Sequence, residues 1–75
     1  MYIYEATVLA LRLNCCIQRR GVIKCGIQYK PHRGTKADDE YFQVIYSESP
    51  NDKNARRRWV PKVRDILADD WMIVT

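Results

Sequence analysis

The stretch from Trp59 to Trp71 constrains the fold more than any other part of the chain. It holds both tryptophans and has the pattern of a strand, a short helix and the start of a closing strand. Pro61 has no N–H for a sheet ladder but suits the first turn of a helix, so we expect the strand to end there. Apolar residues then recur at helical spacing, which predicts a helix over residues 62–69 with one packed face. The residues of that face are Val63, Ile66 and Leu67.

The N-terminal segment, residues 1–13, favours a second helix, because it is rich in Ala and Leu. Its apolar residues are too many to lie on one narrow stripe. A helix of this kind is buried on more than one side, so we expect part of it to contact another subunit. The alternative is that the segment is a strand.

Alternating apolar and polar residues predict the strands of one sheet, with Gly21 as the turn between the first two. We expect these strands at residues 15–20, 22–29, 41–47 and 56–60, with residues 72–74 closing the sheet. Residues 30–40 are interpreted as a long polar loop, which is either a basic arm that folds over an anion or a solvated segment. The predicted fold class is α+β, with a mainly antiparallel sheet of four or five strands, an N-terminal helix and a short C-terminal helix.

The composition indicates one domain, residues 1–75, with a small core. A chain of 75 residues supplies about 3–5 kcal/mol from a single core. Because 47% of its residues are hydrophobic, we expect some apolar surface to meet a second copy, in a dimer or tetramer. Three cysteines, two of them adjacent at Cys15 and Cys16, favour a reducing cytosol over a disulfide framework. The apolar N-terminal run contains Glu5 and is too short for a membrane span.

The sequence offers little for catalysis. It contains no nucleophile motif and no glycine-rich phosphate loop, and its single histidine, His32, has no obvious partner for catalysis or for metal binding. The pair Asp69-Asp70 is more typical of a hydrogen-bonded helix end than of an acid and base. We therefore expect neither an enzyme nor a cofactor or metal site.

Binding of an anion is better supported. The net charge is +4, and arginines on strands supply bidentate contacts to phosphates while aromatic rings stack on bases. Two structural alternatives stay open. If Arg19 points inward with Ile17, a salt bridge to Asp65 or Asp70 satisfies it as well as a phosphate does. The arginine run at 56–58 also suits an exposed strand edge that is protected from aggregation.

The order of motifs resembles a known family. Trp-x-Pro, then Asp-x-Leu-Ala-x-Asp-Trp and an apolar strand, occur at Trp59, Pro61, Asp65, Leu67, Ala68, Asp70 and Trp71. An aromatic-led helix, a turn and an apolar-x-Arg-x-Gly motif occur at residues 4–13, at Asn14 and at residues 17–21. This order resembles the second family of Thoeris anti-defence proteins, which are small phage proteins.

Two residues depart from the family pattern. Asn14 stands where the family has Gly, and Asn is the usual second choice for a left-handed helix cap. Val22 stands where the family has Trp, which removes a ring that the resemblance places in the ligand pocket and leaves the ligand's identity open. With this position included, the candidate ligand-binding residues are Arg19, Arg20, Val22, Lys24, Tyr46, Arg57 and Trp59.

The resemblance implies a sponge in the cytoplasm of the infected bacterial host. Such a protein captures a small cyclic nucleotide or cyclic ADP-ribose-type immune signal without cleaving it, and evades immunity by starving the host effector. Two other functions remain open. A small basic nucleic-acid-binding module explains the charge and the aromatic residues equally well, and a protein-interaction module explains the apolar helix but not the arginines.

Overall fold

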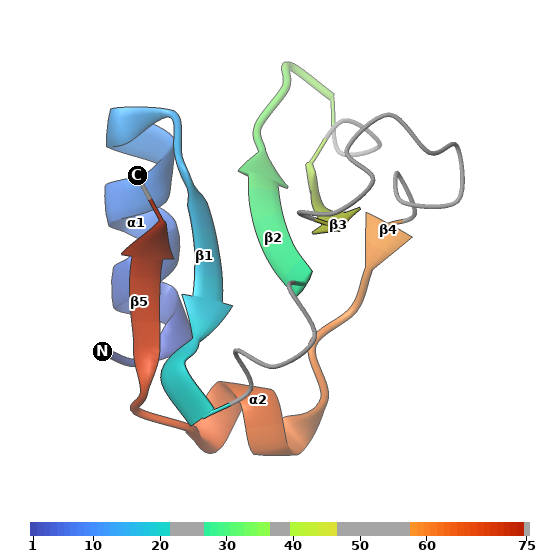
Figure 1. Cartoon of the computed structure of the whole chain (residues 1–75). Helices are drawn as coiled ribbons and strands as arrows, with labels where there is room; N and C mark the ends of the chain where they lie inside the picture. Colours follow the sequence, from blue (N-terminus) through green and yellow to red (C-terminus); the bar gives the residue numbers. More distant parts are fainter. Residues whose placement is uncertain (22–26, 37–39, 47–57, 75) are drawn as a thin grey trace.

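The computed structural model describes residues 1–21, 27–36, 40–46 and 58–74 (Figure 1). Within these ranges an N-terminal helix and a short second helix accompany five strands. The helices are α1 (Ile3–Leu13) and α2 (Val63–Leu67), and the strands are β1 (Cys16–Arg19), β2 (Ile27–His32), β3 (Tyr41–Tyr46), β4 (Arg58–Trp59) and β5 (Trp71–Val74). The predicted α+β fold with its two helices is confirmed.

The five strands form one antiparallel sheet in the order β4-β3-β2-β1-β5. The last strand of the chain, β5, pairs with the first, so that Arg19 lies opposite Trp71. On the other side of β1, Ile17 lies opposite Tyr29 of β2. This pairing brings the C-terminal stretch, which the sequence singled out, next to the N-terminal hairpin.

Helix α1 covers one face of this sheet, behind β1 and β5 in Figure 1. The helix ends at Asn14, which adopts the left-handed conformation with φ 55°. Asn tolerates this conformation, so it can replace the Gly of the family pattern as the helix cap. The Cys15 N–H donates to the Ala10 carbonyl at 3.0 Å and completes the cap. Ala6 and Ala10 have no bulky side chain, so the helix approaches the sheet closely. The buried core consists of Ile3, Ala6, Ala10, Ile17 and Trp71.

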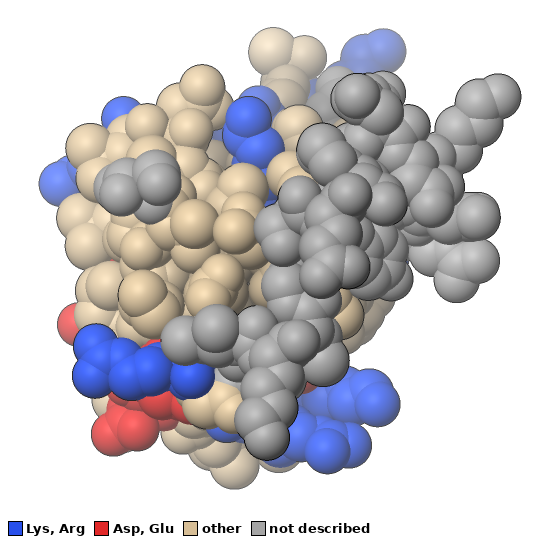
Figure 2. Space-filling view, in the orientation of Figure 1, with Lys and Arg blue, Asp and Glu red and all other residues tan. Residues whose placement is uncertain are grey.

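The opposite face of the sheet is turned toward the viewer in Figures 1 and 2. Over β1 and β5 this face shows a broad area without Lys, Arg, Asp or Glu, and charged side chains gather near the end of the strands at α2 (Figure 2). By register, its residues on these two strands are Cys16, Gln18, Met72 and Val74. None of the helices in the described ranges is long and apolar enough to cross a membrane.

Two predictions from the sequence are wrong. Strand β2 continues through Lys30 and Pro31 to His32, where we expected a loop to begin. Pro31 is tolerated because β1 starts only at Cys16 and the described pairing of this end of β2 is with β3, which leaves the proline on an edge-like segment.

The second error concerns α2. Its apolar side chains do not pack: Val63 is 71% exposed, Ile66 50% and Leu67 70%. The reason is Asp65, whose carboxylate accepts the Lys62 N–H at 2.8 Å and also faces Arg19. The helix therefore turns its acidic side toward the sheet and its apolar side outward.

Candidate ligand-binding groove

A groove of about 640 Å³ runs between α1 and the strand ends of β2, β3 and β4. We call it the α1 groove. One wall is a single stripe of the helix, in which each residue lies three or four positions from another member: Tyr4, Thr7, Val8 and Leu11. The opposite wall is formed by strand residues that include His32, Tyr41, Phe42, Arg58 and Trp59.

The position of Trp59 is set by the aromatic side chains around it. Its ring stacks on Tyr29 with 3.9 Å between the ring centroids, and it meets Phe42 edge to face at 5.6 Å. Because Trp59 is only half-buried, these contacts hold its ring in place while part of its surface still lines the groove. A fixed indole ring in an apolar groove is suited to stack on a flat ligand group such as a nucleobase.

Three groove-lining residues, His32, Tyr41 and Arg58, form a stacked set with Gln43 on the strand face opposite to Phe42 and Trp59. The His32 and Tyr41 rings are parallel at 4.9 Å, and the Arg58 guanidinium carbon lies 4.5 Å above the Tyr41 centroid. His32 Nε2 and Gln43 Oε1 are 2.6 Å apart. Cross-strand register explains the set, since His32 lies opposite Tyr41 and Gln43 opposite Arg58. The cation–π contact presents the guanidinium as a flat donor surface.

The electrostatic character of the groove is cationic. Arg33 and Arg58 line it, and Glu40 is the one acidic residue among the described residues that do so. An apolar floor with a few cations at the rim fits an anionic ligand with an aromatic part.

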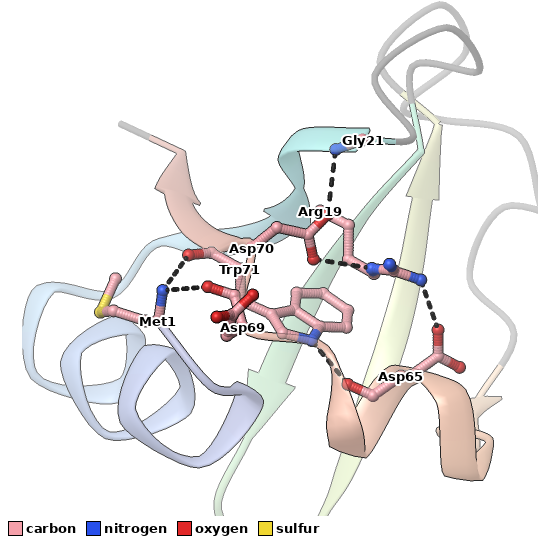
Figure 3. Close-up of polar contacts among 7 residues, drawn as sticks. All are labelled: Met1, Arg19, Gly21, Asp65, Asp69, Asp70 and Trp71. Atoms are coloured by element: carbon pink, nitrogen blue, oxygen red, sulfur yellow. Dashed lines mark hydrogen bonds and ion pairs between the residues drawn. The ribbon is translucent and has the colours of Figure 1, made fainter.

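Arg19 is held at another place, at the end of β1 (Figure 3). Its Nε donates to Asp70 Oδ1 at 2.9 Å, and its Nη1 lies 3.6 Å from Asp65 Oδ1. The Arg19 hydrogen bond lowers the pKa of the Asp70 carboxyl and correspondingly raises the pKa of Arg19. The salt bridge that the sequence left open as an alternative to a phosphate is therefore confirmed.

Further bonds lock this corner of the molecule. The Gly21 N–H donates to Asp70 Oδ2 at 3.2 Å, and the Trp71 Nε1–H donates to the Asp65 carbonyl at 2.7 Å. The amino nitrogen of Met1 donates to the Asp69 carbonyl at 2.7 Å (Figure 3). Asp65, Asp69 and Asp70 thus hold together the junction of β1, α2 and β5. These contacts are consistent with the interpretation of Asp69-Asp70 as a hydrogen-bonded end of the helix.

The remaining predicted ligand-binding residues are distributed differently. Arg20 is exposed just after β1, and its N–H donates to the Asp70 carbonyl at 3.0 Å. Val22, Lys24 and Arg57 lie outside the described residues, as does the side chain of Tyr46. Of the predicted residues whose side chains the structure describes, Trp59 is the one that lines the groove, and the ligand-binding roles of all seven residues stay predictions.

Neither His32 nor Tyr41 was predicted as a binding residue, and Arg58 was considered only as part of the arginine run at 56–58. The available signal was a histidine within the 30–40 segment and an aromatic residue directly after it, but that segment was interpreted as a loop. Only the register of β2, β3 and β4 brings the three side chains together. The described residues contain no group of three or more His, Cys, Asp or Glu that is arranged to hold a metal ion.

Comparison with known proteins decides the family. A model of the Thoeris anti-defense 2-like domain, or Tad2-like domain, matches residues 1–74. The chain belongs to the Tad2-like family. The match spans the N-terminal helix, the whole sheet and the C-terminal stretch, and so confirms the resemblance noted at both ends of the sequence. Tad2-like membership supports an anti-defence role against Thoeris and the description as a phage-type protein. No curated protein and no solved structure matches the chain.

Proposed function

We propose that this protein is a sponge that captures a small cyclic nucleotide signal of Thoeris immunity in the host cytoplasm and does not cleave it. The observation that carries the proposal is the half-buried Trp59 ring in an apolar groove whose lining also includes Arg33 and Arg58. In this arrangement the ring stacks on the base and the guanidinium groups bind phosphate oxygens.

The chemistry of the groove favours capture over cleavage. Its described lining contains no cysteine or serine, and its histidine is stacked on Tyr41 and bonded to Gln43. A sponge needs only tight binding and enough copies of the protein. A site that binds its ligand no more weakly than it binds the transition state of cleavage does not accelerate that cleavage.

We propose in addition that the functional unit is a homo-oligomer. Val60, at 80% exposed, continues the outward apolar side of α2, which consists of Val63, Ile66 and Leu67. Together these four residues form what we call the α2 patch. An apolar patch on so small a chain is typical of a surface that another protein covers. Because Val60 also lines the α1 groove, a second copy on the α2 patch would lie next to the ligand and help to enclose it.

A thermal-shift screen at two salt concentrations tests the proposal. The ligands are cyclic ADP-ribose isomers, cyclic di- and trinucleotides, and short single-stranded DNA and RNA. A ligand that binds only the folded protein raises Tm by mass action. The proposal requires that a small cyclic nucleotide raises Tm in both salts, because its few charges release few counterions.

Matched variants locate the site. Arg58→Gln removes a cation from the groove, and Arg64→Gln removes an exposed cation from α2 outside it. The nucleotide-induced shift should fall for Arg58→Gln and persist for Arg64→Gln. Stabilisation by oligonucleotides alone, and only at low salt, would replace the sponge with a nucleic-acid-binding module.

A further inference from the structure

A second cleft, of about 590 Å³, adjoins the α1 groove at the C-terminal half of α1. The two hollows share Val8 and Leu11 of the helix, Pro31 and His32 at the end of β2, and Arg33 directly after it, so they form one trough along the helix. The second cleft adds Arg12, Asn14 and Lys30 to this shared lining. We call it the basic cleft.

The two ends of the trough differ in chemistry. The α1 groove ends among Tyr4, Trp59, Val60 and Pro61, whereas the basic cleft has no acidic residue among the described residues that line it. One end of the trough is therefore apolar and aromatic, and the other is cationic.

The cations of the basic cleft are Arg12, Lys30 and Arg33, and they are available to a ligand. None of the three forms an ion pair within the described part of the chain, in contrast to Arg19, which has two aspartate partners. The negative end of the α1 dipole is nearby, but its roughly half charge offsets only part of three positive charges.

Different elements hold these cations in place. Arg12 is in the last turn of α1, and Lys30 is half-buried on β2, opposite Gln43 of β3. Arg33 follows β2 directly and lines both hollows, so it links the aromatic end to the cationic end. The Lys30 side chain lies on the face of β2 that pairs with Gln43 and is near Cys16, away from α1, so Lys30 adds only a longer-range positive charge to the cleft. Arg12 and Arg33 are two guanidinium groups that approach the cleft from a helix and from a strand end. They suit the several oxygens of a phosphate group better than a single carboxylate.

We propose that Arg12 and Arg33 form a phosphate subsite of the same trough. The ligand then places a base or nucleoside against Trp59 and a pyrophosphate or phosphodiester in the basic cleft. This assignment rests on the proposed function. It narrows the ligand class to nucleotides that are long enough for a base at Trp59 and a phosphate in the basic cleft, on the other side of His32. A nucleoside without phosphate is held only by the aromatic end.

Two measurements test the subsite. The first is calorimetric titration of the best cyclic nucleotide from the screen into the wild-type protein, Arg12→Gln, Arg33→Gln and the control Arg64→Gln. Hydrogen bonds to charged groups contribute about 1.5–3 kcal/mol, so each cleft substitution should weaken binding on the order of 10- to 100-fold, and the control should change it little. Unchanged thermal melting of the free variants shows that they fold.

The second measurement needs no nucleotide. Inorganic pyrophosphate is titrated into ¹⁵N-labelled protein while the side-chain Nε–H signals of arginine are followed by NMR. The subsite predicts saturable shifts of the Arg12 and Arg33 signals, with the Arg64 signal unmoved.

The outcomes separate the two proposals. If Arg12→Gln and Arg33→Gln both bind the nucleotide as tightly as the wild-type protein does, the phosphate subsite is overturned and the sponge proposal still stands. If no cyclic nucleotide binds the wild-type protein, the sponge fails, and the pyrophosphate titration then decides the subsite alone. Saturable shifts at Arg12 and Arg33 support it, and equal small shifts at all arginines overturn it.

Discussion

Trp59 on β4 and Trp71 on β5 lie with their ring centroids 5.9 Å apart, although these strands are the two edges of the five-stranded sheet. In a flat sheet the edge strands would be separated by four spacings, on the order of 19 Å. The sheet is therefore strongly curled, and the two tryptophans meet with Tyr29 on its concave face. This curl joins the core, where Trp71 is buried, to the α1 groove, which Trp59 lines.

The two tryptophans should differ in their contribution to stability. Trp71 is 2% exposed and its indole N–H is bonded, so Trp71→Ala should lower the free energy of unfolding by about 3–5 kcal/mol. Trp59→Ala should cost less, because Trp59 is only half-buried and part of it lines the groove. Urea denaturation measures both values, and an equal loss for the two variants would contradict the assignment of Trp59 to the site.

The Arg19–Asp70 pair predicts a dependence of stability on pH. The folded-state pKa of Asp70 is lowered, first by its hydrogen bond from Arg19, so the pair stabilises the protein above the unfolded-state pKa of about 4. That contribution is lost as the pH falls through the lower folded-state pKa. Asp70→Asn should therefore be less stable than wild type at neutral pH, by about 1–2 kcal/mol, and the difference should shrink in acid. Chemical denaturation from pH 7 to pH 2 measures this, and a constant difference would refute it.

Gly21 should not accept a side chain without cost. A Cβ at this position would lie 3.0 Å from Asp70 Oδ2, the oxygen that accepts the Gly21 N–H. We expect Gly21→Ala to displace the Asp70 carboxylate and to destabilise the wild-type protein, but to have a smaller effect in the Asp70→Ala background. A double-mutant cycle of thermal unfolding measures this coupling, and strict additivity would show that the close approach has no energetic consequence.

The α2 patch should control assembly. Leu67→Glu places a charge on the patch, whereas Arg64→Glu changes the charge of the same helix at an exposed polar position. We expect the first variant to lower the mass measured by light scattering toward that of the 8.9 kDa chain, and the second to leave the mass unchanged. A wild-type protein that is monomeric at every concentration would contradict the homo-oligomer.

The sequence predicts the class of each element well, because the local signals agree with the final packing. Pro61 does precede the second helix, Ile27 and Tyr29 do share a face of their strand, and Trp71 is core. The position of a proline and the alternation of a strand depend only on residues that are adjacent in the sequence. A large apolar side chain such as that of Trp71 is stable mainly in the core.

The sequence predicts the site poorly, because the site depends on register between distant segments. Nothing near His32 in the chain reveals that it lies opposite Tyr41, or that Arg58 of a third strand covers the same ring. The orientation of α2 is missed for a similar reason. Its apolar pattern predicts burial, but Asp65 must reach Arg19, and this contact, made over a long sequence separation, turns the helix.

The most direct test of the central claim is recovery of the ligand after capture. The protein is incubated in excess with the cyclic nucleotide from the screen, free ligand is removed by filtration, and the protein is then denatured by heat. The sponge predicts that the filtrate is depleted of ligand before denaturation and that chemically intact nucleotide is released afterwards, with depletion reduced for Arg58→Gln. A cleaved product, or a ligand that is never retained by the wild-type protein, would contradict capture without cleavage.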